Sequence, residues 1–300
     1  MGNRYEPYDR GARLLHGELR LLALNVSDEV KSQTEEFRLR VGQPLHLTLP
    51  GGEMPLSGTE VSVGDLEQIL DEATEFSRYT AARSLRQGYL TAPGGFRIGV
   101  CGRIRGGEDG GIEDISSMAI RIPRPCRGTA VPVLPELLEN GFPLSTLILS
   151  PPGGGKTTLL RDMVRLLGNG TQHCPALAVS VVDERGELAA MYRGRVQMDV
   201  GRQTDVTEGL SKAVAVPILL RAMRPQVIAL DEIALPEDVE AVKSAAGCGV
   251  VLLSTIHAPS LEALRQKELG KSLLECGVFH RAVILSSRCG ERHSRVEVLT

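Results

Sequence analysis

A glycine-rich stretch between two apolar runs is the feature that most limits how this chain can fold. Residues 146–160 read TLILSPPGGGKTTLL. Residues 146–149 are β-branched or apolar and are bounded by turn residues, which favours a buried strand. From Lys156 onward the apolar residues recur at helical spacing until Gly168, so a helix is expected there. A strand that runs through a tight turn into a helix predicts a fold of the α/β class.

The residues of this turn are types that bind phosphate groups. The glycines at 153–155 can adopt positive φ angles, which lets consecutive backbone N–H groups point inward, and the helix start adds unpaired N–H donors. Lys156 can reach the outer phosphates of a nucleotide, and the Thr157 hydroxyl can bind Mg²⁺. The predicted nucleotide-binding residues are therefore Ser150, Pro151, Pro152, Gly153, Gly154, Gly155, Lys156, Thr157 and Thr158.

The match to the phosphate-loop pattern G-x-x-x-x-G-K-[ST] has one departure. Gly155, Lys156 and Thr157 fit the pattern, but Ser150 stands where it has its first glycine. Serine is small but lacks the conformational freedom of glycine, so the start of the loop is expected to differ slightly. The alternative interpretation is a glycine-rich turn with a surface lysine. The strand, turn and helix in succession favour the phosphate loop.

Acidic side chains follow two further apolar runs. The run VIAL is followed by Asp231 and Glu232, at the edge of a parallel sheet where ligands bind. Asp231 can hold the Mg²⁺ shell and Glu232 can polarise the attacking water; an ordinary acidic strand end is the alternative. The run LAVSVV ends in Asp183 and Glu184, and either acid can join the metal and water network. Glu184 is thus a second candidate for the catalytic base.

A histidine ends another predicted strand. His257 follows the run VLLSTI. A lone histidine at a strand end is more often structural than catalytic. Because this strand is expected beside the phosphate loop, a catalytic role in sensing the γ-phosphate is the second interpretation, and both stay open.

The distribution of apolar runs and prolines predicts two domains. Residues 1–125 mix helical and strand patterns, including a β-hairpin at 88–104, and predict a smaller α+β domain. Residues 126–143 are rich in proline and are expected to form a linker. Residues 144–300 alternate short strands with helical stretches, which predicts a mostly parallel sheet. The expected strands of that sheet are residues 146–149, 177–182, 227–230, 250–255 and 281–286.

Composition limits the classes of function. The chain has 300 residues, a net charge of −3, 3% aromatic residues and no tryptophan. A site for single-stranded nucleic acid is expected to need basic residues and stacking aromatics, so strong nucleic-acid binding is not expected. The sequence has no apolar run near the ~18 residues of a membrane span and no apolar segment typical of a signal peptide at its start. A cytoplasmic protein is therefore expected.

Four motifs occur in a fixed order: the phosphate loop, VVDERGEL, VIALDE and STIHA. In this order they resemble the ATPases of type II and type IV secretion and of pilus retraction. The match is closer to the stage III sporulation protein AA family, through EEFRLRVGQPL, LRQGYLTAPGGFRIGVCGR, ISSMAIRIPRP and RPQVIALDEI. Together with the four motifs, these segments span most of the chain from Glu35 to Ala258. Residues 205–225 depart from the family pattern, in which a helix richer in glycine and methionine is expected.

The resemblance implies a C-terminal RecA-like P-loop ATPase domain that follows the smaller α+β domain in the chain. It also implies hydrolysis of ATP with Mg²⁺. It implies that copies of the chain form a ring, a hexamer, with ATP at the subunit boundaries. It also implies membrane-embedded sporulation channel proteins as partners, which would hold the protein at the membrane. The ring would energise or gate a secretion-like channel between mother cell and forespore during endospore formation.

In ring ATPases an arginine from a neighbouring subunit or domain also meets the γ-phosphate. Arg97 and Arg103 are candidates, because they lie six residues apart on the second strand of the 88–104 hairpin and so share one face. Arg105 shares that face. A solvated arginine stripe is the alternative interpretation.

Two other functions remain as alternatives. The first is a nucleic-acid-associated P-loop ATPase, because cousins of this ATPase domain have a module that binds single strands. The negative charge and the few aromatic residues argue against it. The second is a small-molecule kinase, which needs a lid and a substrate pocket; the sequence offers no convincing candidate for either.

Overall fold

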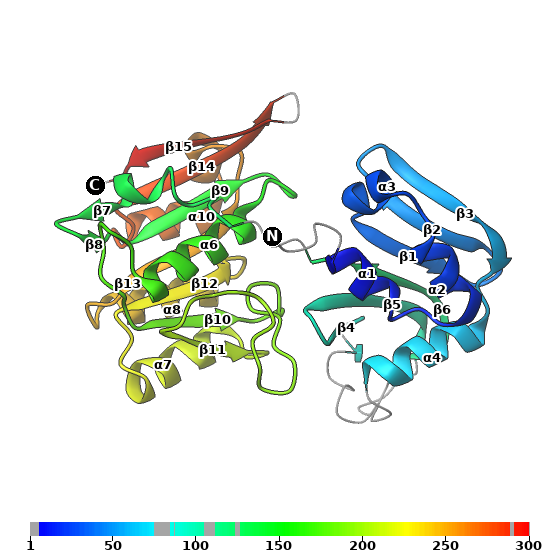
Figure 1. The fold of residues 1–300 in the computed structure, drawn as a ribbon. Helices are drawn as coiled ribbons and strands as arrows, with labels where there is room; N and C mark the ends of the chain where they lie inside the picture. Colours follow the sequence, from blue (N-terminus) through cyan, green and yellow to red (C-terminus); the bar gives the residue numbers. More distant parts are fainter. Residues whose placement is uncertain are drawn as a thin grey trace. The chain divides into compact units, whose positions relative to one another are not determined.

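The computed structural model describes residues 6–74, 85–86, 88–104, 112–123, 127–288 and 291–299, and it divides the chain into two compact units. The first is Met1–Arg124 with Ala190–Gln197, and the second is Pro125–Ala189 with Met198–Thr300. Figure 1 shows both with the labels used below. The predicted fold class is confirmed, because the first unit is α+β with an antiparallel sheet and the second has a mostly parallel sheet between helices.

A six-stranded antiparallel sheet forms the centre of the first unit, in the order β3-β2-β1-β6-β5-β4. Its strands are β1 Glu36–Arg40, β2 Pro44–Leu49, β3 Gly52–Glu60, β4 Tyr89–Ala92, β5 Phe96–Ile104 and β6 Ile112–Arg121. Its helices are α1 Glu6–Ala12, α2 Gly17–Leu24, α3 Asp28–Gln33 and α4 Val63–Ala73. Side chains from α1, α2 and α4 join alternate strand residues such as Phe37 and Leu39 in one core, so one face of the sheet is covered by helices.

Two local structures of the first unit follow directly from its sequence, a hairpin and a helix cap. The predicted hairpin is present, with β4 and β5 paired antiparallel and Ala92 opposite Phe96. Helix α4 begins at a capping box, where the Asp65 backbone N–H donates to Ser62 Oγ and the Ser62 N–H donates to the Asp65 carboxylate. Helices α1 and α2 precede the sheet as two separate helices.

A seven-stranded sheet forms the centre of the second unit, in the order β11-β10-β12-β13-β9-β14-β15. Neighbouring strands are parallel, except that β15 runs antiparallel to β14. The strands are β9 Thr146–Ser150, β10 Val179–Asp183, β11 Thr204–Glu208, β12 Val227–Glu232, β13 Val251–His257, β14 Arg281–Arg288 and β15 Glu291–Val298. The helices are α6 Lys156–Asn169, α7 Lys212–Ala222, α8 Pro236–Ala246, α9 Leu261–Arg265 and α10 Glu268–Glu275.

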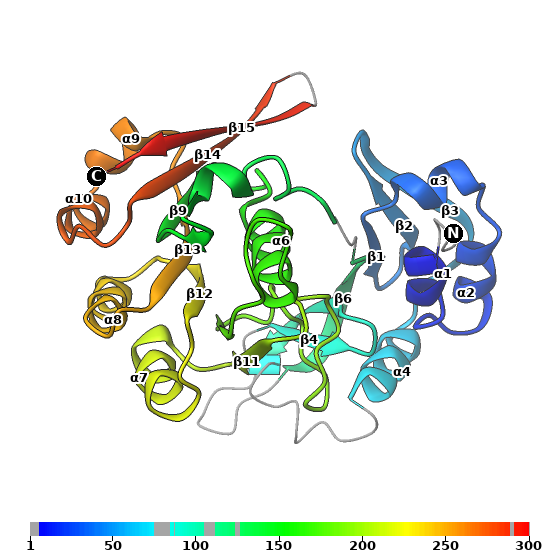
Figure 2. The same ribbon diagram turned by 60° about the vertical axis from the view of Figure 1, so that its left-hand side comes forward.

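Helices cover both faces of this sheet. Figure 2 shows α6 on one face and α7, α8 and α10 on the other. Strands β9 and β10 are buried at every position, and β12 is buried up to Asp231. A strand covered on both faces is apolar throughout, which is why the sequence revealed these strands.

The five predicted strands are present, but the sequence reasoning missed two edge strands. Strand β11 reads TDVTE and β15 reads ERHSRVEV, both rich in polar residues. An edge strand leaves more of its surface in water and therefore lacks a continuous apolar run. Residues 205–225, which depart from the family pattern, therefore include part of strand β11. They also include helix α7, which has Pro217 inside it.

The proline-rich stretch, expected to be a linker, is instead part of the second unit. It forms a 3-10 helix, η1 Leu134–Leu137, and a strand pair, β7 Leu138–Glu139 with β8 Phe142–Pro143. Ala130 is fully buried, and its N–H donates to Asp162 Oδ2 of α6 at 2.8 Å. This buried hydrogen bond therefore attaches the stretch to α6.

A short segment of the predicted C-terminal domain belongs to the first unit. Residues Ala190–Gln197 cluster there, and the Gly94 N–H donates to Gln197 Oε1 at 2.8 Å. The chain leaves the second unit at Ala190, which has a positive φ of 50°. Contacts between residues far apart in the chain decide this placement, and such contacts leave no pattern in the sequence. Among the helices of the described ranges, none has the length and apolar character needed to cross a bilayer.

Candidate active site

The predicted phosphate loop joins β9 to α6. Gly153 and Gly155 have φ angles of 74° and 93°, which residues with a side chain rarely adopt. A Cβ atom at Gly154 would collide with the side chain of Ser150. The backbone N–H groups at the start of α6 have no acceptor within the helix, and the helix dipole adds positive charge there. The loop therefore has the geometry that binds an anion.

Ser150, the departure from the phosphate-loop pattern, fits without strain. It is fully buried as the last residue of β9, its φ lies outside the left-handed region, and its Oγ donates to Pro151 O at 2.8 Å. Glycine is therefore not required at this position, and the loop keeps its turn with a serine.

Lys156 points into the protein toward the neighbouring strand. Its side chain is buried, and Nζ lies 2.8 Å from His257 Nδ1 and 3.5 Å from Ser150 O. Burial lowers the pKa of Lys156, partly opposed by Glu232 and Glu187. The other ring nitrogen of His257, Nε2, lies 3.0 Å from Glu232 Oε2. Lys156, His257 and Glu232 therefore form one chain of polar contacts.

Asp231 lies beside this chain at the end of β12. Its Oδ1 is 2.9 Å from Lys212 Nζ, and its Oδ2 accepts from the Glu184 N–H at 3.1 Å. Burial raises the pKa of Asp231 to about 6; Lys212 opposes that shift, and the nearby acids Asp183 and Glu184 add to it. The carboxylate is thus held in one orientation by partners on two elements.

Asp183 and Glu184 follow the same strand but have different surroundings. Asp183 is fully buried, and its carboxylate accepts from the N–H groups of Glu187, Leu188 and Ala189. This geometry favours a structural role, in which Asp183 holds the turn after β10, over the metal role considered from the sequence. The Glu184 carboxylate is directed to Lys212, with Oε2 at 3.0 Å from Nζ.

Four residues of the site were missed in the sequence, and one of them is Thr255 of β13. Lys212 is a buried partner of two predicted acids, and Arg185 and Glu187 line the same cavity as the phosphate loop. One signal was available for Lys212: only six of the 34 lysine and arginine residues are lysines, and Lys156 is another of the six. Arg185 and Glu187 lie within the DERGEL motif, but no rule of spacing separates them from its other charged residues.

The structure gathers most predicted residues around one cavity of about 380 Å³. Its lining comes from the phosphate loop, the turn after β10 and the ends of β12 and β13. The lining residues are Pro152, Gly153, Gly154, Gly155, Lys156, Thr157, Thr158, Arg185, Glu187, Asp231, Glu232, Thr255 and His257. A phosphate-binding loop, three carboxylates and a histidine therefore face one space.

A second cavity, of about 220 Å³, lies on the other side of the loop. It shares Gly154, Gly155 and Thr158 with the first cavity. The rest of its lining is Thr129, Pro132, Leu159, Leu285, His293 and Ser294. The two cavities are therefore neighbours at the loop.

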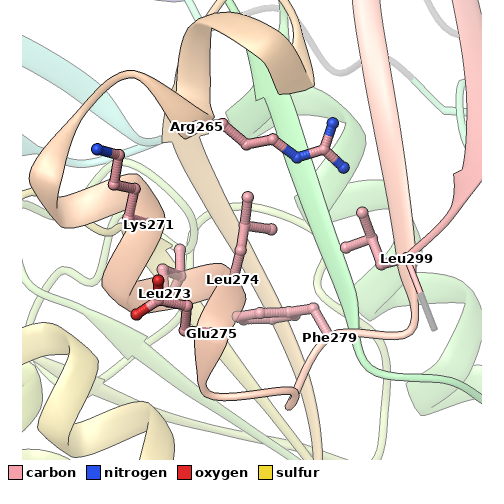
Figure 3. A pocket seen from close by; sticks show the side chains of 7 residues that line it. All are labelled: Arg265, Lys271, Leu273, Leu274, Glu275, Phe279 and Leu299. Atoms are coloured by element: carbon pink, nitrogen blue, oxygen red, sulfur yellow. The ribbon is translucent and has the colours of Figure 1, made fainter.

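A larger cavity, of about 460 Å³, lies elsewhere in the second unit, and Figure 3 shows its lining. It is formed by α9, α10 and the chain after β15, and Leu274 and Phe279 project between them. The lining residues are Arg265, Lys271, Leu273, Leu274, Glu275, Phe279 and Leu299. Volume alone would favour this cavity, but it contains none of the predicted site residues, so the chemistry points to the smaller one.

The arginine candidates lie on the exposed side of β5. Phe96, Ile98 and Val100 are buried, and Arg97 and Arg103 occupy the alternate face. The Arg97 guanidinium lies over the Tyr89 ring, 4.0 Å from its centroid. Arg103 is 3.4 Å from Asp114, with a side chain 76% exposed. Arg105 lies outside the described residues.

The two units, with a phosphate loop and acids at the edge of a parallel sheet, define the fold of the secretion ATPases. The Legionella pneumophila ATPase DotB shares it, with a TM-score of 0.58 at 17% identity, over 89% of this chain and 77% of DotB. The pilus retraction motor PilT, solved with bound ADP, gives a TM-score of 0.57 at 15% identity, over 88% of this chain and 79% of PilT.

The chain belongs to the family described as Sporulation stage III, protein AA, whose model matches residues 7–296. It is 37% identical to Stage III sporulation protein AA of Bacillus subtilis (strain 168) over 260 residues, which is 86% of this chain and 84% of that protein. It is 30% identical to the competence protein ComGA of Streptococcus pneumoniae (strain ATCC BAA-255 / R6) over 150 residues, 49% of this chain and 42% of ComGA. The resemblance drawn from the motifs is thereby confirmed.

Proposed function

We propose that this chain hydrolyses ATP in the cavity of about 380 Å³, with Mg²⁺ as cofactor. The observation that supports it is the arrangement of Lys156, His257 and Glu232 in one chain of contacts beside the phosphate loop. A phosphate loop by itself explains nucleotide binding. Hydrolysis also needs a group that orients the attacking water, and Glu232 lies where such a group can act.

Each residue has a distinct role in this proposal. The N–H groups of the loop and the Lys156 ammonium bind the phosphates. Thr157 and Asp231 would hold Mg²⁺, which neutralises charge that develops on the phosphate oxygens during transfer. Their donor atoms are oxygens, the ligands that Mg²⁺ prefers. In the described part of the chain, no group of three His, Cys, Asp or Glu side chains is placed to hold a metal, which suits an ion that takes its other ligands from phosphate and water.

Glu232 is the better supported of the two candidate bases. Its carboxylate is paired with His257 and lines the phosphate cavity. The Glu184 carboxylate is paired with the buried ammonium of Lys212. The lining of the phosphate cavity includes Glu232 and not Glu184.

The neighbouring cavity supports binding of the rest of the nucleotide. It shares Gly154, Gly155 and Thr158 with the phosphate cavity, and its lining includes Pro132 and Leu285. These apolar groups suit the flat surface of a base, and the hydroxyl of Thr129 suits the sugar. Adenosine triphosphate is therefore proposed to extend from one cavity into the other.

The names of relatives support a mechanical role. One relative is a stage III sporulation protein and one structural neighbour is a pilus retraction motor. We infer that copies of this chain form a ring homo-oligomer, a hexamer, that energises or gates a secretion-like channel between mother cell and forespore. Membrane-embedded channel proteins would hold the ring at the membrane from the cytoplasmic side. Arg97 or Arg103 of one subunit would then complete the site of its neighbour.

The ATPase rate, measured against protein concentration with and without single-stranded DNA, tests this function. A ring with sites at subunit boundaries should gain activity per chain as the concentration rises. Lys156→Ala serves as the inactive control in both arms. A rate per chain that stays constant with concentration and rises with DNA would favour the nucleic-acid-associated ATPase instead.

A further inference from the structure

Lys212 is a buried cation surrounded by acids. It is the first residue of α7, and its side chain is only 4% exposed. Its Nζ lies 2.9 Å from Asp231 Oδ1, 3.0 Å from Glu184 Oε2 and 3.8 Å from Asp238 Oδ1. Three carboxylates on three separate segments thus face one ammonium group.

The helix position and the burial of Lys212 both disfavour a positive charge there. A positive charge at a helix N-terminus meets the positive end of the helix dipole. Removing an ammonium from water also costs free energy that only close, well-oriented partners can offset. The acids, and not the helix, therefore account for a lysine here.

The geometry also suits a lysine at this position, in a chain with only six lysines. An ammonium has three N–H donors that point in different directions, whereas a guanidinium is a planar fork suited to one carboxylate. Asp231, Glu184 and Asp238 approach Nζ from β12, from the turn after β10 and from α8. Lys212 can therefore satisfy acids that a guanidinium at the same place would not reach together.

The contacts of Lys212 separate two neighbouring acids. Asp231 is held toward Lys212 on one oxygen and toward the Glu184 N–H on the other. Glu232, the next residue, is directed to His257 at 3.0 Å. Glu184 is drawn to the same ammonium as Asp231. Asp231 and Glu184 therefore both contact the buried ammonium of Lys212, whereas Glu232 contacts His257 in the phosphate cavity.

We propose that Lys212 is a positioning residue for ATP hydrolysis, which fixes Asp231 at the metal side of the site and keeps Glu184 away from the attacking water. This role rests on the proposed ATPase function. Lys212 itself lies outside the lining of the phosphate cavity. Its loss should therefore change turnover and leave the binding of nucleotide phosphates intact.

The test compares Lys212→Met with the wild-type full-length chain. ADP affinity is measured by calorimetry without Mg²⁺, and kcat and KM are measured for ATP with Mg²⁺. We expect kcat to fall at least about tenfold, because a small displacement of a catalytic group has large effects on rate. ADP affinity should stay within about threefold of wild type, since its phosphate contacts remain. Lys243→Met is the matched control: Lys243 is a half-exposed lysine of α8 that pairs with Glu240, and both quantities should stay unchanged.

A second variant separates positioning from folding. In Lys212→Met/Glu184→Gln, one freed acid is replaced by an amide that can donate to Asp231. We expect this variant to recover kcat at least about threefold over Lys212→Met, because Asp231 regains a partner. If Lys212→Met fails to fold, Glu184→Gln alone tests whether Glu184 is kept away from the attacking water. It should then lower kcat far less than Glu232→Gln does.

Each outcome supports or overturns a specific claim. A folded Lys212→Met with normal kcat, or with ADP affinity and kcat reduced in parallel, would overturn the positioning role. Glu184→Gln as inactive as Glu232→Gln would also overturn it. Wild-type protein that does not hydrolyse ATP at any concentration would instead overturn the proposed function, and the role of Lys212 with it.

Discussion

Lys156 Nζ lies 2.8 Å from His257 Nδ1, so the lysine of the phosphate loop and the histidine that ends β13 are in direct contact. The other ring nitrogen of His257 lies 3.0 Å from Glu232 Oε2. One imidazole therefore links the phosphate-binding cation to the proposed catalytic base. In the proposed function, a phosphate that drew Lys156 toward itself would change the contacts of His257, and this change would reach Glu232 through a single ring.

This link gives His257 a measurable role in turnover. His257→Ala should lower kcat about tenfold or more, because Glu232 loses the donor that orients it. ATP affinity should change less, since Lys156 and the loop N–H groups remain. Steady-state kinetics and calorimetry give the two quantities separately. His280→Ala, at an exposed histidine of the same unit, is the control; equal losses of affinity and kcat in His257→Ala would contradict the link.

Removing the loop lysine tests nucleotide binding. Hydrogen bonds to charged groups contribute roughly 1.5–3 kcal/mol, so Lys156→Ala should weaken ATP binding about tenfold or more. Calorimetry with ATP measures the change. Lys271→Ala, which alters an exposed lysine at the separate cavity of Figure 3, should leave the affinity unchanged. Unchanged affinity in Lys156→Ala would refute the assignment of the loop.

Substitution of Glu232 separates binding from chemistry. Glu232→Gln should still bind ATP with Mg²⁺ but lose turnover by roughly 10²–10⁴-fold, the usual scale for a general base. Asp231→Asn should instead weaken the dependence of the rate on Mg²⁺. Single-turnover measurements with both variants distinguish the two effects. Normal hydrolysis by Glu232→Gln would make Glu184 the better candidate.

The arginines of β5 can be tested by mixing inactive subunits. An arginine supplied in trans is worth roughly 10³–10⁵ in rate, so neither Arg97→Ala/Arg103→Ala nor Glu232→Gln alone should hydrolyse ATP well. Mixed rings should regain some activity, because each variant supplies what the other lacks. Native mass measurement verifies that mixed rings form. Mixed rings that stay inactive at every ratio would leave these arginines as surface groups, in keeping with the exposure of Arg103 and its contact with Asp114.

The buried lysine of the loop should also affect stability with pH. The pKa of Lys156 is lowered by burial, so folding favours its neutral form. The charged form therefore destabilises the folded chain at neutral pH, and this effect disappears as the pH rises from the folded-state pKa through the unfolded value of 10.5. Lys156→Met should raise Tm at pH 7, by about 2–4 °C for each kcal/mol gained, and the difference should shrink near pH 10. A difference that grows with pH would contradict this sign.

The sequence by itself determined the phosphate loop, the central strands of the second unit and the family. Their signals are local or continuous in the chain. The loop needs glycines at 153–155 next to Lys156, and a strand covered on both faces needs an unbroken apolar run. The edge strands β11 and β15 have no such run, because one side of each is open to water.

Tertiary structure alone decided which charged groups meet. Lys212 and Glu184 are 28 residues apart in the chain, and Lys156 and His257 are 101 apart, yet both pairs are in contact. The parallel order of β10, β12, β13 and β9 brings their carboxyl ends to one edge, and side-chain packing then selects the partners. Motif spacing suggested roles for Asp231 and Glu232 and left Glu184 as a second candidate base. Their contacts with Lys212 and His257 appear only in the fold, since electrostatic pairing depends on distance in space and not on order along the chain.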